Sequence, residues 1–462
     1  MAVFLNLHDL SIPERESVVR DLEITPIVQS IQFDPKSGQR KMIKCPSSTP
    51  IQFYNASLSS GKLAIPFNYA QTKFNLHPDT SPAPKLNLSL VAEFEYRPHQ
   101  LPIIEEATRH LNSDRNSTTL QINTSAGKTI MSIALAVEQG LKTLIVVPRK
   151  TLADQWAETI LKITTPASPE SKVLILPEAF KESKIDIGKR IEKISASDFV
   201  ICLPERISGI PETLLESFFG TLIIDEAHLF CTRENSAALL KVAPRKVIAL
   251  TATLDRDDEA HKIIRLIAGD HQFFKQSDRP YHIKVVKVPV MIEEVMSPVT
   301  QKLDFSSFKT SLSIDEKYND AIVNVIRENA SRKFIVITRS VQHIKEIQRK
   351  LDAAGEASVS VMYGNMKKCK DAKILIGTDS KIGTGFDVAT FCEEFDGRSP
   401  DALIFAMTVK KWQTYAQIVG RIMRASPEVT PLVFWMRTEN SITGRHLDAL
   451  RGYIKKTEGV FS

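Results

Sequence analysis

A short apolar run that ends in two carboxylates and a histidine, Leu222–His228, constrains the fold of this chain more than any other stretch. Its apolar part is typical of a buried parallel strand, and in doubly wound α/β sheets the carboxyl ends of such strands face the ligand. We expect Asp225 to hold Mg²⁺ and Glu226 to polarise an attacking water. Taken alone, the Asp-Glu pair is as compatible with an ordinary strand-to-helix turn.

A second motif upstream complements this pair. The segment 124–129 (Thr-Ser-Ala-Gly-Lys-Thr) lies between a strand-like and a helix-like run, which is the context that a phosphate-binding loop requires. Backbone amides would cradle the phosphates, the lysine would contact the β and γ oxygens, and the threonine hydroxyl would complete the Mg²⁺ shell. Ile122 stands where the generic loop has its first glycine, so the motif becomes specific only together with Asp225 and Glu226. The residues predicted to bind nucleotide here are Ser125, Ala126, Gly127, Lys128 and Thr129.

Composition places few limits on the partner. The chain has 462 residues, enough for two or three domains, with 43% hydrophobic and 25% charged residues, as in ordinary globular proteins. A net charge of +6 permits a polyanionic partner without requiring one. Five scattered cysteines indicate reduced thiols. Because no secretory signal and no apolar run of ~18 residues occurs, we expect a soluble cytoplasmic protein without membrane contact.

Strands that alternate with helices along most of the chain predict an α/β fold with parallel sheets. We divide it into residues 1–90, a small α+β accessory domain; residues 91–275, the ATP-binding domain; and residues 276–462, a connector and second α/β domain without a phosphate loop. In the accessory domain, four basic residues beside a predicted turn are compatible with a phosphate-backbone contact, although a solvated hairpin is favoured. These residues are Lys36, Arg40, Lys41 and Lys44.

A glutamine near the start of the ATP-binding domain is a candidate for base recognition. The segment Phe94–Gln100 opens a predicted helix that runs towards Leu111, one helix before the phosphate loop. The amide of Gln100 would pair with adenine and select ATP, whereas without the loop an exposed glutamine at a helix start is the simpler interpretation.

Other polar side chains follow predicted strands on the ligand side of the sheets. Trp156 is expected in the core rather than as a base-stacking platform. The hydroxyls of Thr251 and Thr253 can bond a carboxylate or His228 and so register whether nucleotide is bound. The residues expected to contact a nucleic-acid backbone are Arg149, Lys150, Arg206 and Arg339. For Arg206, an exposed side chain without a binding role is an equal alternative.

The second α/β series contributes two further groups. Gly385 permits close backbone approach, and Asp387 would reach a ribose hydroxyl or a basic partner. We expect Gln417, Arg421 and Arg424 to share one face of a helix, where the arginines would neutralise charge that develops on the γ-phosphate. ATP would then control a cyclic domain closure, as in a stepping motor.

The ordered motifs resemble those of superfamily 2 helicases with a DEAH box, from about Tyr96 to about Arg437. The loop without its first glycine is similar to that of the phage branch-migration helicases of the UvsW kind, and the short chain resembles the version in T5-like phages. The nearest rival is the poxvirus-type DNA helicase of transcript release. The motifs are segments 124–129, 148–156, 225–228, 251–253, 382–387 and 417–424.

The resemblance implies two tandem RecA-like domains and an ATP- and Mg²⁺-dependent helicase. Such an enzyme would unwind forked DNA and migrate branched junctions in replication, recombination and repair. The alternatives are an RNA helicase or transcript-release translocase, and a catalytically dead nucleic-acid scaffold. By the same resemblance Glu226 is the catalytic base, Thr251 and Thr253 are the coupling pair, and Arg424 is a better finger candidate than Arg421.

Overall fold

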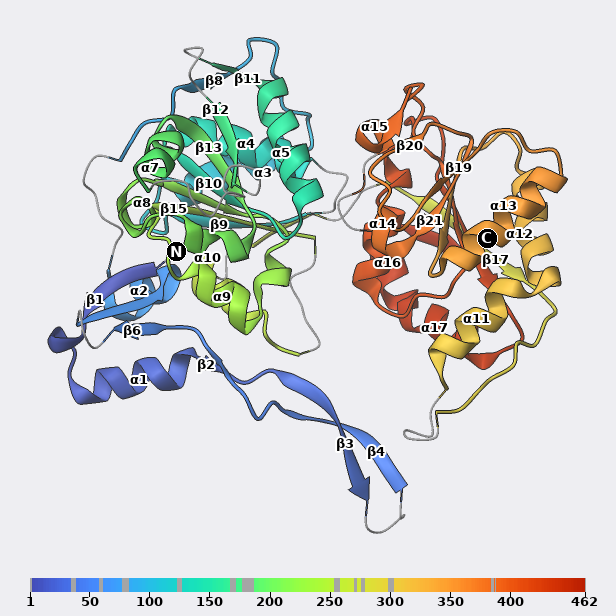
Figure 1. Ribbon diagram of the computed structural model, residues 1–462, viewed down its shortest axis with the longest axis horizontal. Coiled ribbons are helices and arrows are strands. Elements are labelled where there is room, and N and C mark those ends of the chain that lie inside the picture. Colours follow the sequence, from blue (N-terminus) through green and yellow to red (C-terminus); the bar gives the residue numbers. More distant parts are fainter. Residues whose placement is uncertain are drawn as a thin grey trace. The chain divides into compact units, whose positions relative to one another are not determined.

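The computed structural model describes most of the chain (Figure 1). It divides into two compact units, one built mainly from residues 1–275 and the other mainly from residues 276–462. The described residues are 2–34, 39–57, 61–76, 83–122, 127–166, 172–176, 187–252, 258–269, 272–275, 279–297, 303–383, 386 and 388–461. Among them, no helix has both the length and the apolar character needed to cross a lipid bilayer.

The first unit is organised around a parallel sheet, as predicted. Its seven described strands are, in spatial order, β12 (Lys172–Ile175), β13 (Ser197–Cys202), β10 (Thr143–Val146), β14 (Thr221–Ile224), β15 (Lys246–Thr251), β9 (Ser117–Ile122) and β16 (Gln272–Lys275). Every neighbouring pair is parallel, so the carboxyl ends of β9, β15 and β14 lie side by side at one edge. The sheet therefore brings the phosphate loop and the Asp225 motif to the same edge.

Helices cover both faces of this sheet (Figure 1). Because side chains alternate along a strand, Ile145 and Ile223 pack on one face and Leu144 and Leu222 on the other. Burying each such side chain stabilises the fold by about 1.5–3 kcal/mol. The first face carries α3 (Leu101–Leu111), α4 (Lys128–Gln139) and α5 (Lys150–Ile163). The second carries α7 (Ile187–Ser195), α8 (Glu212–Ser217), α9 (Arg233–Leu239), α10 (Lys262–Ala268) and the 3-10 helices η3 (Pro204–Gly209) and η4 (Ala227–Phe230).

The amino-terminal elements mix helices with antiparallel strands and, apart from residues 31–42, belong to the first unit. Phe53 and Phe67 belong to the same buried cluster as Leu222, so the segments that carry them share a core with the first sheet. They are β1 (Ala2–Asn6), η1 (Leu7–Asp9), α1 (Ile12–Leu22), β2 (Glu23–Ile24), β3 (Ile27–Asp34), β4 (Gln39–Pro46), β5 (Ile51–Gln52), β6 (Asn55–Ser57), β7 (Lys62–Pro66) and α2 (Phe67–Phe74). A further small antiparallel pair is formed by β8 (Leu88–Leu90) and β11 (Thr164–Pro166).

The second unit repeats the architecture of a parallel sheet between helices. Its seven described strands are, in spatial order, β19 (Val359–Met362), β21 (Ile374–Thr378), β18 (Phe334–Thr338), β23 (Ala402–Phe405), β24 (Leu432–Arg437), β17 (Tyr281–Lys287) and β25 (Gly459–Phe461). One face carries α11 (Phe305–Ile314), α12 (Glu316–Glu328) and α13 (Val341–Ala353). The other carries α14 (Asp379–Ile382), α15 (Val388–Phe391), α16 (Trp412–Val419) and α17 (Ser441–Lys456).

Candidate active site

The predicted contact between Gln100 and the phosphate loop is present. Gln100 precedes α3 and is only 2% exposed, so the alternative of an exposed glutamine is wrong. Its Oε1 accepts a hydrogen bond from the Arg97 backbone N–H at 3.0 Å. Gly127 has a φ of +86°, and a Cβ added there would lie 2.5 Å from Nε2 of Gln100. Glycine is therefore required at this position both by backbone conformation and by the approach of the amide.

Lys128 begins α4 and is buried, which is unusual for a lysine. Its ammonium group donates a hydrogen bond to the Ile122 carbonyl at 3.1 Å, across the two ends of the phosphate loop. Thr129 follows in the first turn of the helix and is half-buried. The lysine at the start of α4 is therefore held against the end of β9, where it could exchange the carbonyl for a phosphate oxygen.

Asp225 lies directly after β14 and is held by two donors. The Trp156 indole N–H donates to Oδ2 at 2.9 Å, and the Glu226 backbone N–H donates to Oδ1 at 2.9 Å. Burial, together with repulsion from Glu226, raises the pKa of Asp225 to about 6, against the opposing charge of Lys128. The prediction of a core position for Trp156 is confirmed, since the side chain is 1% exposed.

Glu226 has a backbone φ of +49°, a left-handed conformation that is strained for glutamate. Its Oε2 atom is buried and has no hydrogen-bond partner among the described residues. The same atom lies 3.5 Å from Nδ1 of His228, and that nitrogen lies 3.1 Å from Oγ1 of Thr251. The predicted contact between Thr251 and His228 is thus present, and it connects the end of β15 to the carboxylate after β14.

These residues fit a nucleotide with Mg²⁺. The glycine that leaves room for Gln100, the buried lysine and the unsatisfied Glu226 oxygen are all features that a bound phosphate and water would complete. In the described part of the chain, no three His, Cys, Asp or Glu residues are grouped to hold a metal ion. A Mg²⁺ that takes most of its ligands from phosphates and water needs only Thr129 and Asp225 from the protein. When bound, it would neutralise charge on the β and γ oxygens.

The arginine motif of the second unit differs from the prediction. Gln417 is buried in α16, but that helix ends at Val419, and Arg424 lies in the separate 3-10 helix η5 (Ile422–Arg424). The expectation that these residues share one face of a single helix is therefore wrong. The Arg421 N–H bonds the Ile418 carbonyl at 3.0 Å, which tightens the turn, and the Arg421 guanidinium donates to the Gly383 carbonyl at 2.6 Å. Burial of this arginine against another loop overrides continuation of the helix.

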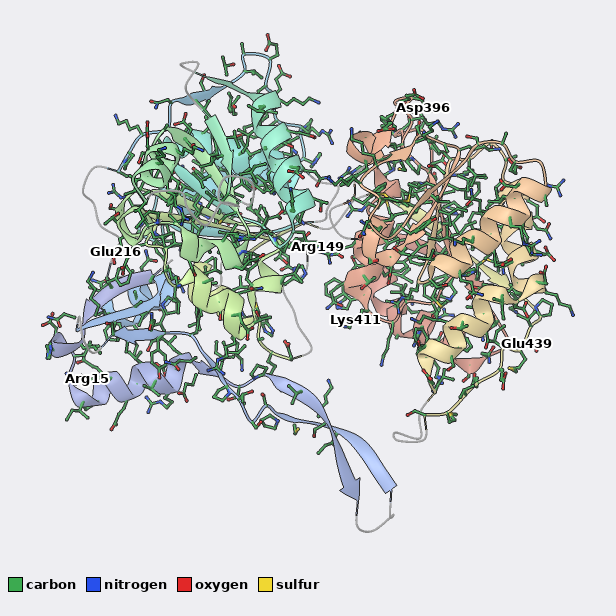
Figure 2. All side chains as sticks on the ribbon, in the orientation of Figure 1. Arg15, Arg149, Glu216, Asp396, Lys411 and Glu439 are labelled. Atoms are coloured by element: carbon green, nitrogen blue, oxygen red, sulfur yellow. The ribbon has the colours of Figure 1, made fainter. Side chains whose placement is uncertain are left out.

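The predicted nucleic-acid contacts fall into two classes. Arg149 and Lys150 are exposed at the start of α5, and Figure 2 shows Arg149 at the surface of the first unit. Arg206 is likewise exposed in η3. Arg339 is different, because its Nε lies 2.9 Å from an Asp379 carboxylate oxygen and its guanidinium lies over the ring of Phe305. A nucleic acid would have to compete with that ion pair. Five predicted site residues lie outside the described residues: Ser125, Ala126, Thr253, Gly385 and Asp387.

The sequence interpretation missed two supporting residues. Trp156 was expected only to fill the core, yet its N–H orients Asp225. Arg421 was expected to face phosphate, yet it bonds the Gly383 carbonyl. A buried tryptophan needs a partner for its indole N–H, and this requirement was the available signal for the first. Nothing in the sequence spacing indicates the second contact, which joins the turn after α16 to the residue that follows α14.

Comparison with known proteins identifies the family. A family model described as "Type III restriction enzyme, res subunit" matches residues 93–256. The chain is 30% identical over 417 residues to "Putative helicase 161L" of Invertebrate iridescent virus 6, covering 86% of this chain and 88% of the relative. It is 26% identical over 219 residues to "Putative ATP-dependent RNA helicase QP509L" of African swine fever virus (isolate Pig/Kenya/KEN-50/1950), covering 45% of this chain and 41% of that protein.

Comparison with solved structures shows a fold that is consistent with the similarity in sequence to these relatives. The structure of Dbp5 from S. cerevisiae, bound to RNA and ADP BeF3, superposes with a TM-score of 0.53 at 13% sequence identity, covering 78% of this chain and 89% of Dbp5. The two sheets are thus tandem RecA-like domains, as the resemblance implied. Given the extent of its similarity to the iridescent virus helicase, the chain belongs to the superfamily 2 helicases.

Proposed function

We propose that the protein is an ATP-dependent DNA helicase or translocase that unwinds forks and remodels branched junctions. Within superfamily 2 it would act as a DEAH-box enzyme of the UvsW type, similar to the T5-like phage version, in replication, recombination and repair. The amino-terminal elements would read DNA structure, and the enzyme would work in the cytoplasm of the cell in which it is made.

The observation that carries this proposal is the convergence of the nucleotide motifs at one sheet edge. Gln100 lies against Gly127, and Lys128 bridges the phosphate loop. Asp225 and Glu226 follow a strand that is separated from the loop's strand only by β15, which ends in Thr251. A phosphate-binding loop, a Mg²⁺ ligand and a carboxylate base in one place are the parts that phosphoryl transfer to water needs.

Each residue has a proposed role in this reaction. Gln100 binds adenine, Lys128 holds the β and γ oxygens, and Asp225 with Thr129 holds Mg²⁺. Glu226 accepts the proton of the attacking water, and its link to Thr251 through His228 transmits the nucleotide state, with Thr253 as second partner. Arg424 neutralises the γ-phosphate, while Arg421 and Gln417 support it from the same motif. Gly385 and Asp387 contact nucleotide and strand, and the proposed contacts to the DNA backbone are Arg149, Lys150, Arg206 and Arg339.

The indole N–H of Trp156 offers a specific test of the Asp225 site. Trp156→Phe keeps an aromatic ring in the core but removes the donor to Asp225. We expect the Mg²⁺ concentration for half-maximal ATP hydrolysis to rise by about tenfold or more, because outer ligand partners tune metal affinity. The matched control is Trp435→Phe, which removes a buried indole donor to the Thr443 carbonyl in the second unit. An equal Mg²⁺ shift in both variants would contradict the positioning role.

The substrate is tested by ATP hydrolysis with a panel of nucleic acids. Wild type and Lys128→Ala are compared without nucleic acid and with single-stranded DNA, forked DNA, a four-way junction and matched RNA. We expect the strongest Lys128-dependent stimulation with forks or junctions. A rate that no DNA stimulates would disprove the proposal.

An RNA helicase or transcript-release translocase is the second candidate. It is favoured by the name of the African swine fever virus relative, although the similarity covers under half of either chain. Motor domains grip mostly the backbone, so their motifs discriminate poorly between the two sugars. RNA stimulation equal to or greater than that by DNA would support this candidate and would leave the ATP-site assignments in place.

A further inference from the structure

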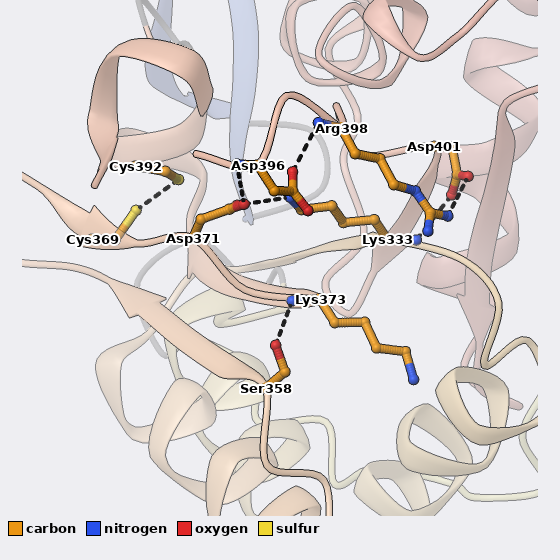
Figure 3. A network of polar contacts seen from close by, with 9 residues as sticks. All are labelled: Lys333, Ser358, Cys369, Asp371, Lys373, Cys392, Asp396, Arg398 and Asp401. Atoms are coloured by element: carbon orange, nitrogen blue, oxygen red, sulfur yellow. Dashed lines mark hydrogen bonds and ion pairs between the residues drawn. The ribbon is translucent and has the colours of Figure 1, made fainter. Parts of the chain in front are cut away.

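Two cysteines of the second unit face each other across a pair of short strands. Cys369 belongs to the short strand β20 (Cys369–Lys370) and Cys392 to β22 (Cys392–Glu393), which pair in parallel with the two cysteines directly opposite each other. Their Sγ atoms lie 3.2 Å apart and both are free thiols. Figure 3 shows the two side chains pointing toward each other. This contact is the starting geometry for a covalent link.

The backbone already satisfies the distance that such a link requires. Neighbouring strands lie about 4.8 Å apart, and a disulfide needs Cα atoms separated by about 4.4–6.8 Å. A backbone hydrogen bond joins the same two segments, since the Asp371 N–H donates to the Glu393 carbonyl at 2.9 Å. The strand pairing is therefore compatible with a disulfide between the two directly opposite cysteines.

A lysine clamp beside the cysteines keeps the two segments in register. The Lys333 ammonium lies 2.7 Å from Oδ2 of Asp371 and 2.9 Å from Oδ1 of Asp396, and the Asp396 backbone N–H also donates to Asp371 (Figure 3). Asp371 follows Cys369 and Asp396 follows Cys392 by a few residues. The clamp therefore joins the same two chain segments that the sulfur contact joins.

The two sulfurs are largely buried and chemically unequal. Cys369 is 5% exposed and Cys392 is 7% exposed, and the lysine clamp next to them, Lys333, Asp371 and Asp396, lines a pocket of about 330 Å³. A hydrogen bond from the Cys392 thiol lowers the pKa of Cys369. Because the thiolate is the nucleophile, the sulfur that accepts this hydrogen bond attacks a small oxidant, and the opposite sulfur, 3.2 Å away, is placed to complete the disulfide.

We propose that Cys369 and Cys392 are a site of reversible disulfide formation by hydrogen peroxide. The Cys369 thiolate attacks one peroxide oxygen, the O–O bond breaks, and the departing hydroxide takes up a proton and leaves as water. The Cys392 sulfur then attacks the sulfenic acid, the S–O bond breaks, and a second water leaves with the Cys392 proton. Two thiols and one peroxide give one disulfide and two waters, and a dithiol reductant reverses the reaction.

The disulfide would close a loop that carries part of the helicase machinery. The residues between the cysteines include β21, α14 and Gly383. The Gly383 carbonyl accepts a hydrogen bond from the Arg421 guanidinium. A cross-link between the ends of this loop lowers the conformational entropy of the unfolded chain. In the folded protein it fixes the two ends of the loop to each other. The effect on turnover rests on the proposed function, whereas formation of the bond does not.

Disulfide mapping of the full chain tests the site directly. The protein is treated with peroxide, free thiols are alkylated, and the peptides are analysed by mass spectrometry. We expect a peptide pair joined through Cys369 and Cys392 that dithiothreitol separates, and a melting temperature of the second unit raised by about 5–10 °C. The control Cys45→Ser should keep both effects. A folded protein that gives no such peptide pair, or only sulfinic acid at Cys369, would overturn the proposal.

ATP hydrolysis then separates the modification from its consequence. Oxidation should slow the DNA-stimulated rate of wild type by about threefold or more, because the cross-link would restrict the segment that carries the Gly383 contact with Arg421. The Cys369→Ala and Cys392→Ala double variant should keep its rate under peroxide. An unchanged rate in fully cross-linked protein would overturn the link to turnover. If wild type shows no stimulated hydrolysis at all, the proposed function fails, while the mapping result still decides the disulfide.

Discussion

Glu226→Gln is expected to lower the rate constant for ATP hydrolysis by about 100-fold or more while nucleotide binding is retained. The Oε2 atom of Glu226 is buried, lacks a hydrogen-bond partner among the described residues, and lies 3.5 Å from His228. A glutamine fills the same volume but cannot accept the proton of the attacking water. Steady-state hydrolysis and equilibrium binding of a fluorescent ATP analogue would measure the two effects separately.

The matched control for this substitution is Glu138→Gln, in the same unit. Glu138 is an exposed carboxylate of α4 that accepts a hydrogen bond from the Tyr96 hydroxyl at 2.8 Å, a role that an amide oxygen can also fill. This variant should hydrolyse ATP at nearly the wild-type rate. Retained turnover after Glu226→Gln would show that another group is the base and that the left-handed backbone at this glutamate serves another purpose.

Lys128→Ala is expected to reduce hydrolysis by about 100-fold or more and to weaken nucleotide binding as well. The ammonium is buried at the mouth of the phosphate loop and donates to the Ile122 carbonyl. Loss of that charge-assisted hydrogen bond should lower the free energy of unfolding by about 1.5–3 kcal/mol. A large loss of activity with a small change in melting temperature would therefore locate the effect in the site.

Lys193→Ala provides the comparison, because Lys193 is an exposed lysine of α7 in the same unit. Its removal changes the net charge by the same amount and should leave both hydrolysis and binding unchanged. If Lys128→Ala keeps nucleotide affinity and rate, the assignment of segment 124–129 as a phosphate-binding loop is wrong, whatever the fold comparison indicates.

The residues that follow buried strands were the most predictable part of the site. Asp225 and Thr251 were placed correctly at one sheet edge because parallel strands with continuous apolar runs must align their carboxyl ends. The contact of Gln100 with the phosphate loop was also anticipated, since only one helix separates them along the chain. The local hydrophobic pattern and the order of parallel strands are sufficient to place residues of this kind in the sheet.

The errors came from contacts between segments far apart in sequence. The spacing of Gln417, Arg421 and Arg424 is compatible with one face of a helix. However, α16 ends at Val419, and the Arg421 guanidinium donates a hydrogen bond to the Gly383 carbonyl. The ion pair of Arg339 with Asp379 was not foreseen either, while the contact of Arg339 with a nucleic acid stays a prediction. Neither partner can be identified from spacing, because each depends on which loops the sheet brings together.

By itself the sequence determined the class of the protein, because apolar strands, a glycine-lysine loop and paired carboxylates each carry a local physical meaning. It predicted two parallel sheets correctly and offered candidates for the ATP-binding half and for the residues that contact phosphate. Only the tertiary structure decided how those residues are supported: the Trp156 N–H on Asp225, the His228 link between Glu226 and Thr251, and the sulfur contact of Cys369 with Cys392. Such contacts are set by packing between distant segments, whose free energy depends on the whole fold rather than on any local run of residues.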